Sequence, residues 1–423
     1  MIEILKVNKL KGRVEAPSSK SISQRVLLLS AFLPGHKKIG PISGCDDEKV
    51  ALAICSGTGM RVLKDGRFYN IFGDPVMPKV LNAGESGTTL RLLLGLLAAK
   101  KWECEIQTEG RLIDRPLKPL IKTFENIGCK ITIDNSTIYF NGTKSDYPSE
   151  IEVDSTESSQ FTSSLLFYMA LNPIEHKIIR INGKIASMGY IEMTTSILNE
   201  MGLNIKMEGN LIHVSGTLEK LDFRKNVEGD YSGASFIMAA GILLSKDKIE
   251  ILNLNKNSLQ PDREILNLLD ENVYWNGNNL ICKRGEVNKE LVIDANKTPD
   301  LAPVIALIGM FSKNGCKIKN SSRLKGKESD RETAIIEIAE SVGCHVERED
   351  DTMEILSGEI TGTPIIPVYR DHRIIMETVI TLAMISQKFI VSGTEYLSKS
   401  FPEFVECLIQ LGFERTNEST TNP

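Results

Sequence analysis

The sequence predicts an α/β protein built from six related units, and three patterns in its 423 residues support this prediction. A short alternation of apolar and polar residues recurs along the chain, as expected for a half-buried β-hairpin. Each alternation follows a stretch with the apolar spacing of a helix, and a second helical stretch lies about half a period earlier. The repeated unit is therefore strand, helix, strand, helix and hairpin.

The hairpins are clearest over residues 127–142, 201–216 and 342–358. Weaker copies are predicted over 58–73 and 271–285, and a truncated copy begins at Leu411. The leading positions recur about every seventy residues, as in a repeat architecture. These positions are Gly59, Gly128, Gly202, Asn272, Gly343 and Gly412.

Two sets of helices are predicted, one directly before the hairpins and one about half a period earlier. Those before the hairpins cover 116–126, 193–200, 264–269, 332–341 and 404–410, and the glycine after most of them suits a left-handed helix cap. The earlier helices begin at capping-type residues. Their predicted starts are Lys20, Ser86, Ser158, Ser232, Pro299 and Asp371.

Length and composition limit the classes of protein. A chain of 423 residues predicts two domains, with three repeats in each as the natural division. The net charge of −5 argues against a nucleic-acid partner held by bulk electrostatics. No apolar run has membrane-spanning length, and the N-terminus lacks a signal-peptide core. We expect a cytoplasmic monomer that binds small molecules and neither nucleic acid nor membrane.

The cysteines and histidines do not predict a metal site. The eight cysteines and five histidines are scattered, without the close pairs of a metal-binding motif. Cys129 and Cys344 occupy matching hairpin positions, where a small buried residue is expected. We expect neither a metal nor another cofactor.

Basic residues gather at the predicted helix starts although the protein is acidic overall. They are Lys20, Arg25, Arg91, Arg115, Lys327, Arg331, His372, Arg373 and Lys399. Helix N-termini present free N–H groups and a positive dipole end, so added cations favour anion binding. The pattern predicts ligands with several phosphates or carboxylates. Taken singly, each cation could instead be a solvated surface charge, and Ser21, Thr88, Ser158 and Ser159 could be plain caps.

Two acidic residues stand among these cations. Asp300 follows Pro299 at one helix start, and Glu328 lies between Lys327 and Arg331 at another. Each could serve only as a first-turn partner of the helix dipole. Among convergent cations, a carboxylate can also transfer protons and stabilise transient positive charge.

Several segments resemble the 5-enolpyruvylshikimate-3-phosphate synthase family, the 3-phosphoshikimate 1-carboxyvinyltransferases. The segment from Pro17 to Arg25 is similar to the family's Pro-Gly-Ser-Lys-Ser-x-Ser-x-Arg motif. Further matches follow in the family's order and span nearly the whole chain. They begin at Ser86, Asp114, Ser158, Pro299, Lys327, Asp371 and Lys399.

The resemblance implies the family's fold, an inverse α/β prism of two domains, each with three βαβαββ repeats. It implies that residues 1–18 and 229–423 form one domain and residues 19–228 the other, with the active site in the cleft between them. It also implies that the first strand belongs with the C-terminal half.

The implied reaction transfers the enolpyruvyl group of phosphoenolpyruvate to the 5-hydroxyl of shikimate 3-phosphate and releases phosphate. By resemblance, Asp300 is the base on that hydroxyl, Glu328 the acid and base at C3, and Lys20 a proton-transfer residue that touches both substrates. The residues implied for shikimate 3-phosphate are Lys20, Ser21, Arg25, Ser158, Ser159, Gln160, Ser187, Tyr190, Asp300, Arg323 and Lys327. Those implied for phosphoenolpyruvate are Lys20, Gly87, Thr88, Arg115, Gln160, Arg331, Arg373 and Lys399.

Three residues depart from the family pattern. Glu85 stands where many members have Asn, Met188 replaces a commonly basic residue, and Arg323 stands where Asn often contacts the shikimate phosphate. Gly87 is retained, so we hypothesise sensitivity to glyphosate, a competitor at the phosphoenolpyruvate site.

Two alternatives remain at this point. The sister enzymes that transfer enolpyruvyl to UDP-N-acetylglucosamine share the repeats, but they usually carry a loop cysteine upstream of the Arg-Pro helix, where this chain has none between Cys104 and Cys129. A non-catalytic binding protein could also keep the fold, although Lys20, Asp300 and Glu328 are all present.

Overall fold

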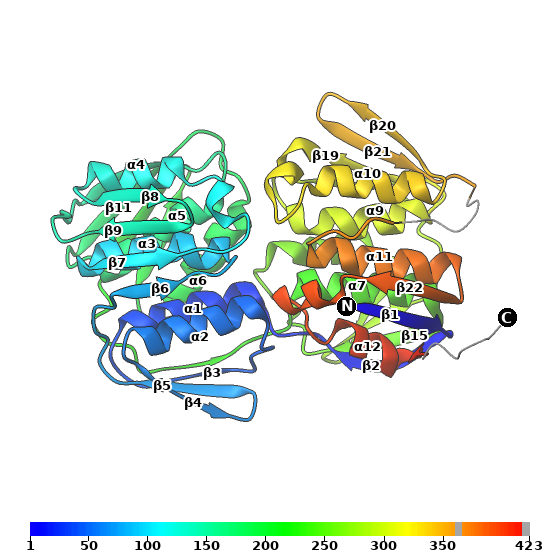
Figure 1. The fold of residues 1–423 in the computed structure, drawn as a ribbon, viewed down its shortest axis with the longest axis horizontal. Coiled ribbons are helices and arrows are strands. Elements are labelled where there is room, and N and C mark those ends of the chain that lie inside the picture. Colours follow the sequence, from blue (N-terminus) through cyan, green and yellow to red (C-terminus); the bar gives the residue numbers. More distant parts are fainter. Residues whose placement is uncertain (360–365, 417–423) are drawn as a thin grey trace. The chain divides into compact units, whose positions relative to one another are not determined.

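Helices and strands alternate throughout the chain in a computed structural model that describes residues 1–359 and 366–416 (Figure 1). The strands of these residues form five four-stranded sheets and one three-stranded sheet. In a typical sheet, ordered β10-β11-β13-β12, the first two strands are parallel and the last two form an antiparallel hairpin. The predicted α/β fold of six repeats is therefore confirmed.

The chain divides into two compact units. We call Ser18–Val227 the inserted unit, and Met1–Pro17 together with Glu228–Pro423 the terminal unit. Each unit has its own apolar core. The chain therefore passes between units twice, after Pro17 and after Val227.

The inserted unit contains three four-stranded sheets. Its strands are β3 (Lys37–Gly40), β4 (Arg61–Asp65), β5 (Phe68–Phe72), β6 (Val80–Asn82), β7 (Glu103–Gln107), β8 (Lys130–Asp134), β9 (Thr137–Asn141), β10 (Glu150–Asp154), β11 (His176–Asn182), β12 (Asn204–Glu208), β13 (Leu211–Ser215) and β14 (Phe223–Asn226). Its helices are α1 (Lys20–Phe32), α2 (Asp46–Gly57), α3 (Gly87–Lys100), the 3₁₀ turn η1 (Leu112–Asp114), α4 (Lys118–Asn126), α5 (Ser159–Leu171) and α6 (Met188–Glu200).

The terminal unit contains the other three sheets. Its strands are β1 (Ile2–Val7), β2 (Leu10–Glu15), β15 (Ser245–Leu252), β16 (Val273–Asn276), β17 (Asn279–Lys283), β18 (Leu291–Asp294), β19 (Cys316–Lys319), β20 (His345–Glu349), β21 (Thr352–Leu356), β22 (Lys388–Ser392) and β23 (Phe413–Arg415). Its helices are α7 (Tyr231–Leu244), η2 (Pro261–Glu264), α8 (Ile265–Leu268), η3 (Pro299–Leu301), α9 (Ala302–Met310), η4 (Ser321–Gly326), α10 (Arg331–Ser341), α11 (His372–Ile385), η5 (Thr394–Lys399) and α12 (Phe404–Leu411).

Two strands pair with a strand from the other half of the chain. Strand β2 precedes α1 in sequence but pairs in parallel with β15 of the terminal unit. Strand β14 precedes α7 but pairs in parallel with β3 of the inserted unit. The leading strands of the first and fourth repeats are thus exchanged.

Strand β1 completes the sixth repeat. It lies between β22 and β23 and is antiparallel to both, so the blue N-terminal strand adjoins the orange β22 in Figure 1. The truncated last repeat therefore obtains from the N-terminus the strand that a local hairpin would otherwise supply.

The first helix of every repeat is buried nearly all round. In α3 and α5, twelve of the residues are buried in each helix, including the polar Arg91 and Ser164. Helices α7, α9 and α11 have the same character in the terminal unit. A helix that is apolar on all faces belongs inside a core, so its polar residues near the N-terminal end are the ones available to a ligand.

The hairpins and their glycines agree with the sequence pattern. Five of the six leading positions are glycines with positive φ, for example Gly128 at +94° and Gly343 at +85°. At Gly128 a Cβ would lie 2.6 Å from the carbonyl oxygen of Lys144. Both the left-handed backbone and the close approach require glycine there.

Several predicted helix boundaries were wrong. Helix α6, predicted over 193–200, begins at Met188. Helix α7 begins at Tyr231, because the Asp230 side chain rather than Ser232 accepts the capping hydrogen bond, from the Gly233 N–H at 2.7 Å. Residues 264–269 form the end of η2 and the short α8. Pro299 begins the turn η3 ahead of α9. Neighbouring capping-type residues compete, and local pattern does not decide between them.

No helix within residues 1–359 and 366–416 is long and apolar enough to cross a membrane. All eight cysteines are free and buried. Burial raises the pKa of Cys129 to about 12, which keeps its thiol protonated and unreactive near neutral pH. In the same residues no group of three or more His, Cys, Asp or Glu side chains could hold a metal ion.

Candidate active site

The residues expected to contact substrates fall into two groups, one in each unit. In the inserted unit they lie at the starts of α1, α3, α5 and α6 and beside η1. In the terminal unit they lie on η3, η4 and η5 and at the starts of α10 and α11.

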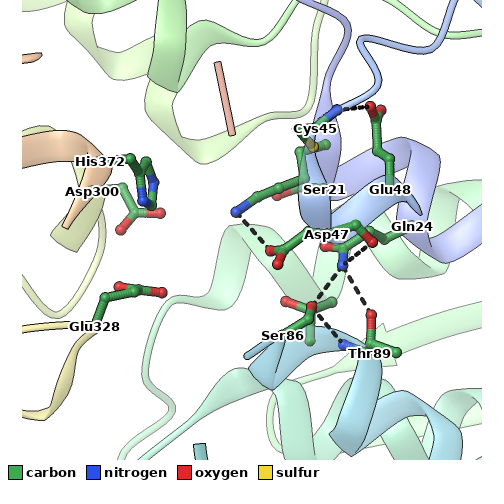
Figure 2. A network of polar contacts seen from close by, with 12 residues as sticks. Ser21, Gln24, Cys45, Asp47, Glu48, Ser86, Thr89, Asp300, Glu328 and His372 are labelled. Atoms are coloured by element: carbon green, nitrogen blue, oxygen red, sulfur yellow. Dashed lines mark hydrogen bonds and ion pairs between the residues drawn. The ribbon is translucent and has the colours of Figure 1, made fainter. Parts of the chain in front are cut away.

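Lys20 is the first residue of α1 and pairs with Asp47 in the first turn of α2. The distance from Lys20 Nζ to Asp47 Oδ2 is 3.0 Å, and both side chains are mostly buried. The Asp47 carboxylate, visible in Figure 2, therefore holds the ammonium group in one place.

Arg25 lies one turn later on α1 and joins that helix to α6. Its Nε donates to Thr194 Oγ1 at 2.8 Å, and its Nη1 donates to the Ser21 carbonyl at 2.7 Å. Its guanidinium stands 6.0 Å from the ring centroid of Tyr190. Burial lowers the pKa of Arg25 to about 10, against the opposing effect of Tyr190, so the side chain remains a cation at neutral pH.

An amide and two hydroxyl groups fix the start of α3. Ser86 caps the helix by accepting from the Thr89 N–H. Gln24 Nε2 donates to Ser86 Oγ at 2.8 Å and to Thr89 Oγ1 at 3.0 Å, as Figure 2 shows. The starts of α1 and α3 are thus tied together by neutral hydrogen bonds.

Gly87 is the first residue of α3 and lies close to a guanidinium. A Cβ at this position would lie 3.0 Å from Arg115 Nη1. The absence of a side chain at Gly87 therefore lets the Arg115 guanidinium lie close to the N-terminus of α3, and a helix N-terminus beside a cation favours an anion.

Gln160 on α5 is held from both ends of its amide. Its Nε2 donates to Thr88 Oγ1 at 2.8 Å, and its Oε1 accepts from Arg91 Nη1 at 2.5 Å. Arg91 Nη2 in turn donates to the Pro116 carbonyl at 2.8 Å. The amide orientation is therefore set by a hydroxyl and a buried cation.

Serines complete the inserted-unit group. Ser158 caps α5 by accepting from the Gln160 N–H, and Ser159 is buried beside it. Ser187 precedes α6 with φ of 50°, a left-handed conformation that is uncommon for serine. Such backbone strain persists where the surrounding structure imposes it, often at ligand sites.

Arg331 is the centre of the terminal-unit group. Its Nη1 donates to Asp300 Oδ1 at 2.7 Å, its Nη2 to Glu328 Oε2 at 2.8 Å, and its Nε to a third carboxylate, Asp371, at 2.8 Å. The Arg331 and Asp371 side chains are 1% and 0% exposed. Burial would lower the pKa of Arg331, but the three carboxylates outweigh it and raise the pKa.

Asp300 faces three cations. Its carboxylate lies 2.7 Å from Arg331 Nη1, 3.2 Å from Arg373 Nη2 and 3.8 Å from Lys327 Nζ. Burial alone would raise the pKa of Asp300, but the cations, Arg373 first, outweigh burial and hold it well below its ordinary value. Asp300 is therefore ionised at neutral pH.

Lys327 has a lowered pKa. Burial, partly offset by Asp300, lowers the pKa of Lys327 to about 8.

Arg373 has buried hydrogen-bond donors without partners. Its side chain is 4% exposed, and within the described residues its Nε and Nη1 find no hydrogen-bond acceptor. Unpaired buried donors on a cation are costly, so an anionic ligand would be strongly favoured there.

The remaining expected residues lie elsewhere in the terminal unit. Arg323 on η4 donates to Asn296 Oδ1 at 3.3 Å. Lys399 is the last residue of η5, two residues before the buried Phe401.

Sequence reasoning missed the partners of these residues. Asp47 and Asp371 were absent from the expected site, and Arg91 was named only among the helix-start cations, although each fixes a member of the site. Asp371 caps α11 by accepting from the Arg373 N–H, so its capping position was a usable signal. Asp47 gave no such signal, because nothing local indicates that it meets Lys20.

Solved structures share this fold. EPSP synthase from Acinetobacter baumannii superposes with a TM-score of 0.75 at 20% identity, covering 99% of this chain and 100% of that one. The enolpyruvyl transferase NikO from Streptomyces tendae gives 0.75 at 13% identity, covering 98% and 99%. The fold is thus that of enolpyruvyl transferases.

Sequence comparison identifies the family. The family model described as EPSP synthase (3-phosphoshikimate 1-carboxyvinyltransferase) matches residues 4–408. A curated relative named 3-phosphoshikimate 1-carboxyvinyltransferase, from Picrophilus torridus, is 36% identical over 413 residues, covering 95% of this chain and 96% of the relative. The chain belongs to the EPSP synthase family.

Proposed function

We propose that the protein transfers the enolpyruvyl group of phosphoenolpyruvate to the 5-hydroxyl of shikimate 3-phosphate. The products are 5-enolpyruvylshikimate 3-phosphate and phosphate. Family membership supports this assignment. The observation that carries it is the cluster in which Asp300 and Glu328 share the buried Arg331, because the reaction needs proton transfer at two atoms and carboxylates can provide it.

The reaction proceeds in two stages through a tetrahedral adduct. First, C3 of phosphoenolpyruvate accepts a proton, C2 becomes electrophilic, and the 5-hydroxyl oxygen bonds to C2 while losing its proton. The adduct then loses phosphate from C2 and a proton from C3, which restores the double bond. One proton is gained at C3 and two are lost, one from the hydroxyl and one from C3, and the departing phosphate takes up the remaining proton as hydrogen phosphate. Protons therefore balance and no group is oxidised or reduced, so the reaction needs no redox cofactor.

Asp300 is the base for the 5-hydroxyl. With three cations around it and a depressed pKa, its carboxylate is a weak base before substrates bind. Substrate phosphate and carboxylate groups neutralise part of this positive charge, which raises the pKa of Asp300. Base strength therefore increases only when anionic substrates are present.

Glu328 is the acid and base at C3. Its Oε2 accepts from Arg331 Nη2, so the same guanidinium fixes both carboxylates. Lys20, held by Asp47, supplies a point charge to both substrates and assists proton transfer.

Binding is divided between residues of different type. Shikimate 3-phosphate is bound by Arg25, Lys327 and Arg323 and by the hydroxyl and amide groups of Ser21, Ser158, Ser159, Gln160, Ser187 and Tyr190. Phosphoenolpyruvate is bound by Arg115, Arg331, Arg373 and Lys399 and by the backbone at Gly87 and Thr88. The unsatisfied donors of Arg373 support this role.

The reaction belongs to the shikimate pathway of aromatic amino-acid biosynthesis. We expect the enzyme to act as a monomer in the cytoplasm, with the two small molecules as its partners.

The test is phosphate release and product mass after the purified protein is mixed with both substrates. A parallel sample contains UDP-N-acetylglucosamine in place of shikimate 3-phosphate. We expect phosphate and the enolpyruvyl ether in the shikimate sample alone. Turnover with the nucleotide sugar would transfer the protein to the sister activity, and ligand binding without turnover would make it a binding protein.

A further inference from the structure

Two neighbouring loops of the inserted unit meet at the carboxyl ends of β6 and β7. These strands are parallel, with Leu81 opposite Ile106. Backbone bonds extend the ladder beyond them, from the Ala83 N–H to the Gln107 carbonyl at 2.9 Å and from the Glu109 N–H to the Gly84 carbonyl at 2.8 Å. Residues 83–86 and 108–111 therefore run side by side.

The exposed Glu85 side chain places its carboxylate against Gly110 where the loops meet. A Cβ at Gly110 would lie 1.7 Å from Glu85 Oε1 and 2.7 Å from its Cδ. Gly110 also has φ of +56°, in the left-handed region. The Glu85 carboxylate thus occupies the space that any side chain at position 110 would need.

The same two loops lead to a second contact. Gly87 follows Glu85 by two residues, and Arg115 follows Gly110 after the turn η1. A Cβ at Gly87 would lie 3.0 Å from Arg115 Nη1. The loop that carries Glu85 thus leads into the start of α3 at Gly87, and the loop that carries Gly110 leads through η1 to Arg115.

We propose that Glu85 is a positioning residue that holds loop 108–111 against the start of α3 and so sets the place of Arg115 beside Gly87. This inference rests on the proposed role of those two residues in binding phosphoenolpyruvate. An exposed carboxylate near an anion site repels the anion. The packing of Glu85 on Gly110 offsets that cost by ordering the cation that binds the substrate.

Two substitutions separate packing from charge. Glu85→Gln keeps the shape and removes the charge, whereas Glu85→Ala removes both. We expect Glu85→Ala to raise KM for phosphoenolpyruvate about fivefold, as for the loss of one polar contact, with KM for shikimate 3-phosphate unchanged. Glu85→Gln should leave KM for phosphoenolpyruvate at or below its original value. Glu105→Ala, on the exposed face of β7, is the matched control.

Gly110→Ala provides a second route to the same contact, because its methyl group displaces the Glu85 carboxylate. The double variant with Glu85→Ala should be no worse than Gly110→Ala alone, since one contact cannot be lost twice. Additive effects, or equal effects of Gln and Ala at position 85, would overturn the proposal. Thermal unfolding of each variant checks that the fold is kept.

Hydrogen exchange makes the test independent of turnover. Amides of residues 108–111 should exchange faster in Glu85→Ala than in the unsubstituted protein and in Glu105→Ala. Equal exchange would refute the positioning role even in an active enzyme. Faster exchange in a protein without enolpyruvyl transfer would retain the loop contact and refute only the proposed function.

Discussion

The residues expected to contact substrates make different kinds of contact in the two units. In the inserted unit, hydroxyl and amide groups at helix starts make most of the contacts, as when Gln160 bonds Thr88. In the terminal unit, buried ions make them, with Arg331 paired to carboxylates on three sides. Neutral bonds fix geometry without altering protonation, whereas each ion in a buried cluster changes the pKa of the others. The first group therefore suits recognition, whereas the second combines cations that suit anion binding with carboxylates that suit proton transfer.

The largest effect should come from the ionic group. Asp300→Ala is expected to lower kcat about a thousandfold, because a positioned base is lost. Asp300→Asn, which preserves shape, should fail nearly as badly. Phosphate release measures turnover, and thermal unfolding checks the fold. Near-normal activity with normal stability would remove Asp300 from the mechanism.

The next largest effect is expected at Lys20, the ammonium group among the inserted-unit residues. Lys20→Arg is expected to lower kcat about a hundredfold, because a planar fork places its donors differently from a point charge and proton transfer suffers. The control is Lys38→Arg, since Lys38 is paired with Asp65 on the surface at 2.7 Å. If Lys20→Arg matched this control, positive charge alone would suffice at the start of α1.

Titration of Lys327 tests whether charge in the terminal unit controls binding. Its pKa is lowered to about 8, so its positive charge is present below that pH and lost above it. We expect kcat/KM for shikimate 3-phosphate to fall as pH rises through about 8, by up to tenfold per unit. Lys327→Arg should move this loss to higher pH. An unchanged alkaline limb would assign the titration to another group.

The same lysine has an opposite effect on stability. Because its folded pKa lies below its unfolded pKa, the charged form costs stability at pH below about 8. That cost decreases as pH rises from about 8 toward the ordinary lysine value. Lys327→Gln should remove this pH dependence from the free energy of unfolding, which urea titration at several pH values can measure.

The smallest effect is expected at Gly87. An added methyl group would meet Arg115 Nη1 at 3.0 Å and Arg91 Nη1 at 3.3 Å, both at the ends of flexible side chains. These groups can shift slightly, so Gly87→Ala should raise KM for phosphoenolpyruvate about three- to tenfold with little change in kcat.

Glyphosate should compete with phosphoenolpyruvate in the unsubstituted protein. Unaffected turnover at high glyphosate would contradict that hypothesis.

The repeat fold was predictable because its signals are local. Alternation marks a hairpin at residues 127–142, and capping residues mark the starts of α3, α5 and α11, whatever the rest of the chain does. Charged residues at helix starts likewise identified Lys20, Arg331 and Arg373 as candidates. Their roles in binding and catalysis remain predictions.

The sequence by itself determined which segments become helices and hairpins and where cations meet helix starts. Only the tertiary structure decided that β2 pairs with β15, β14 with β3 and β1 with β22. It alone also brought Asp47 to Lys20 and Gln160 to Arg91. Alternation in the sequence indicates which face of a strand is buried but not which strand it pairs with. A charge likewise acquires its partner, and so its pKa, only when distant parts of the chain pack around it.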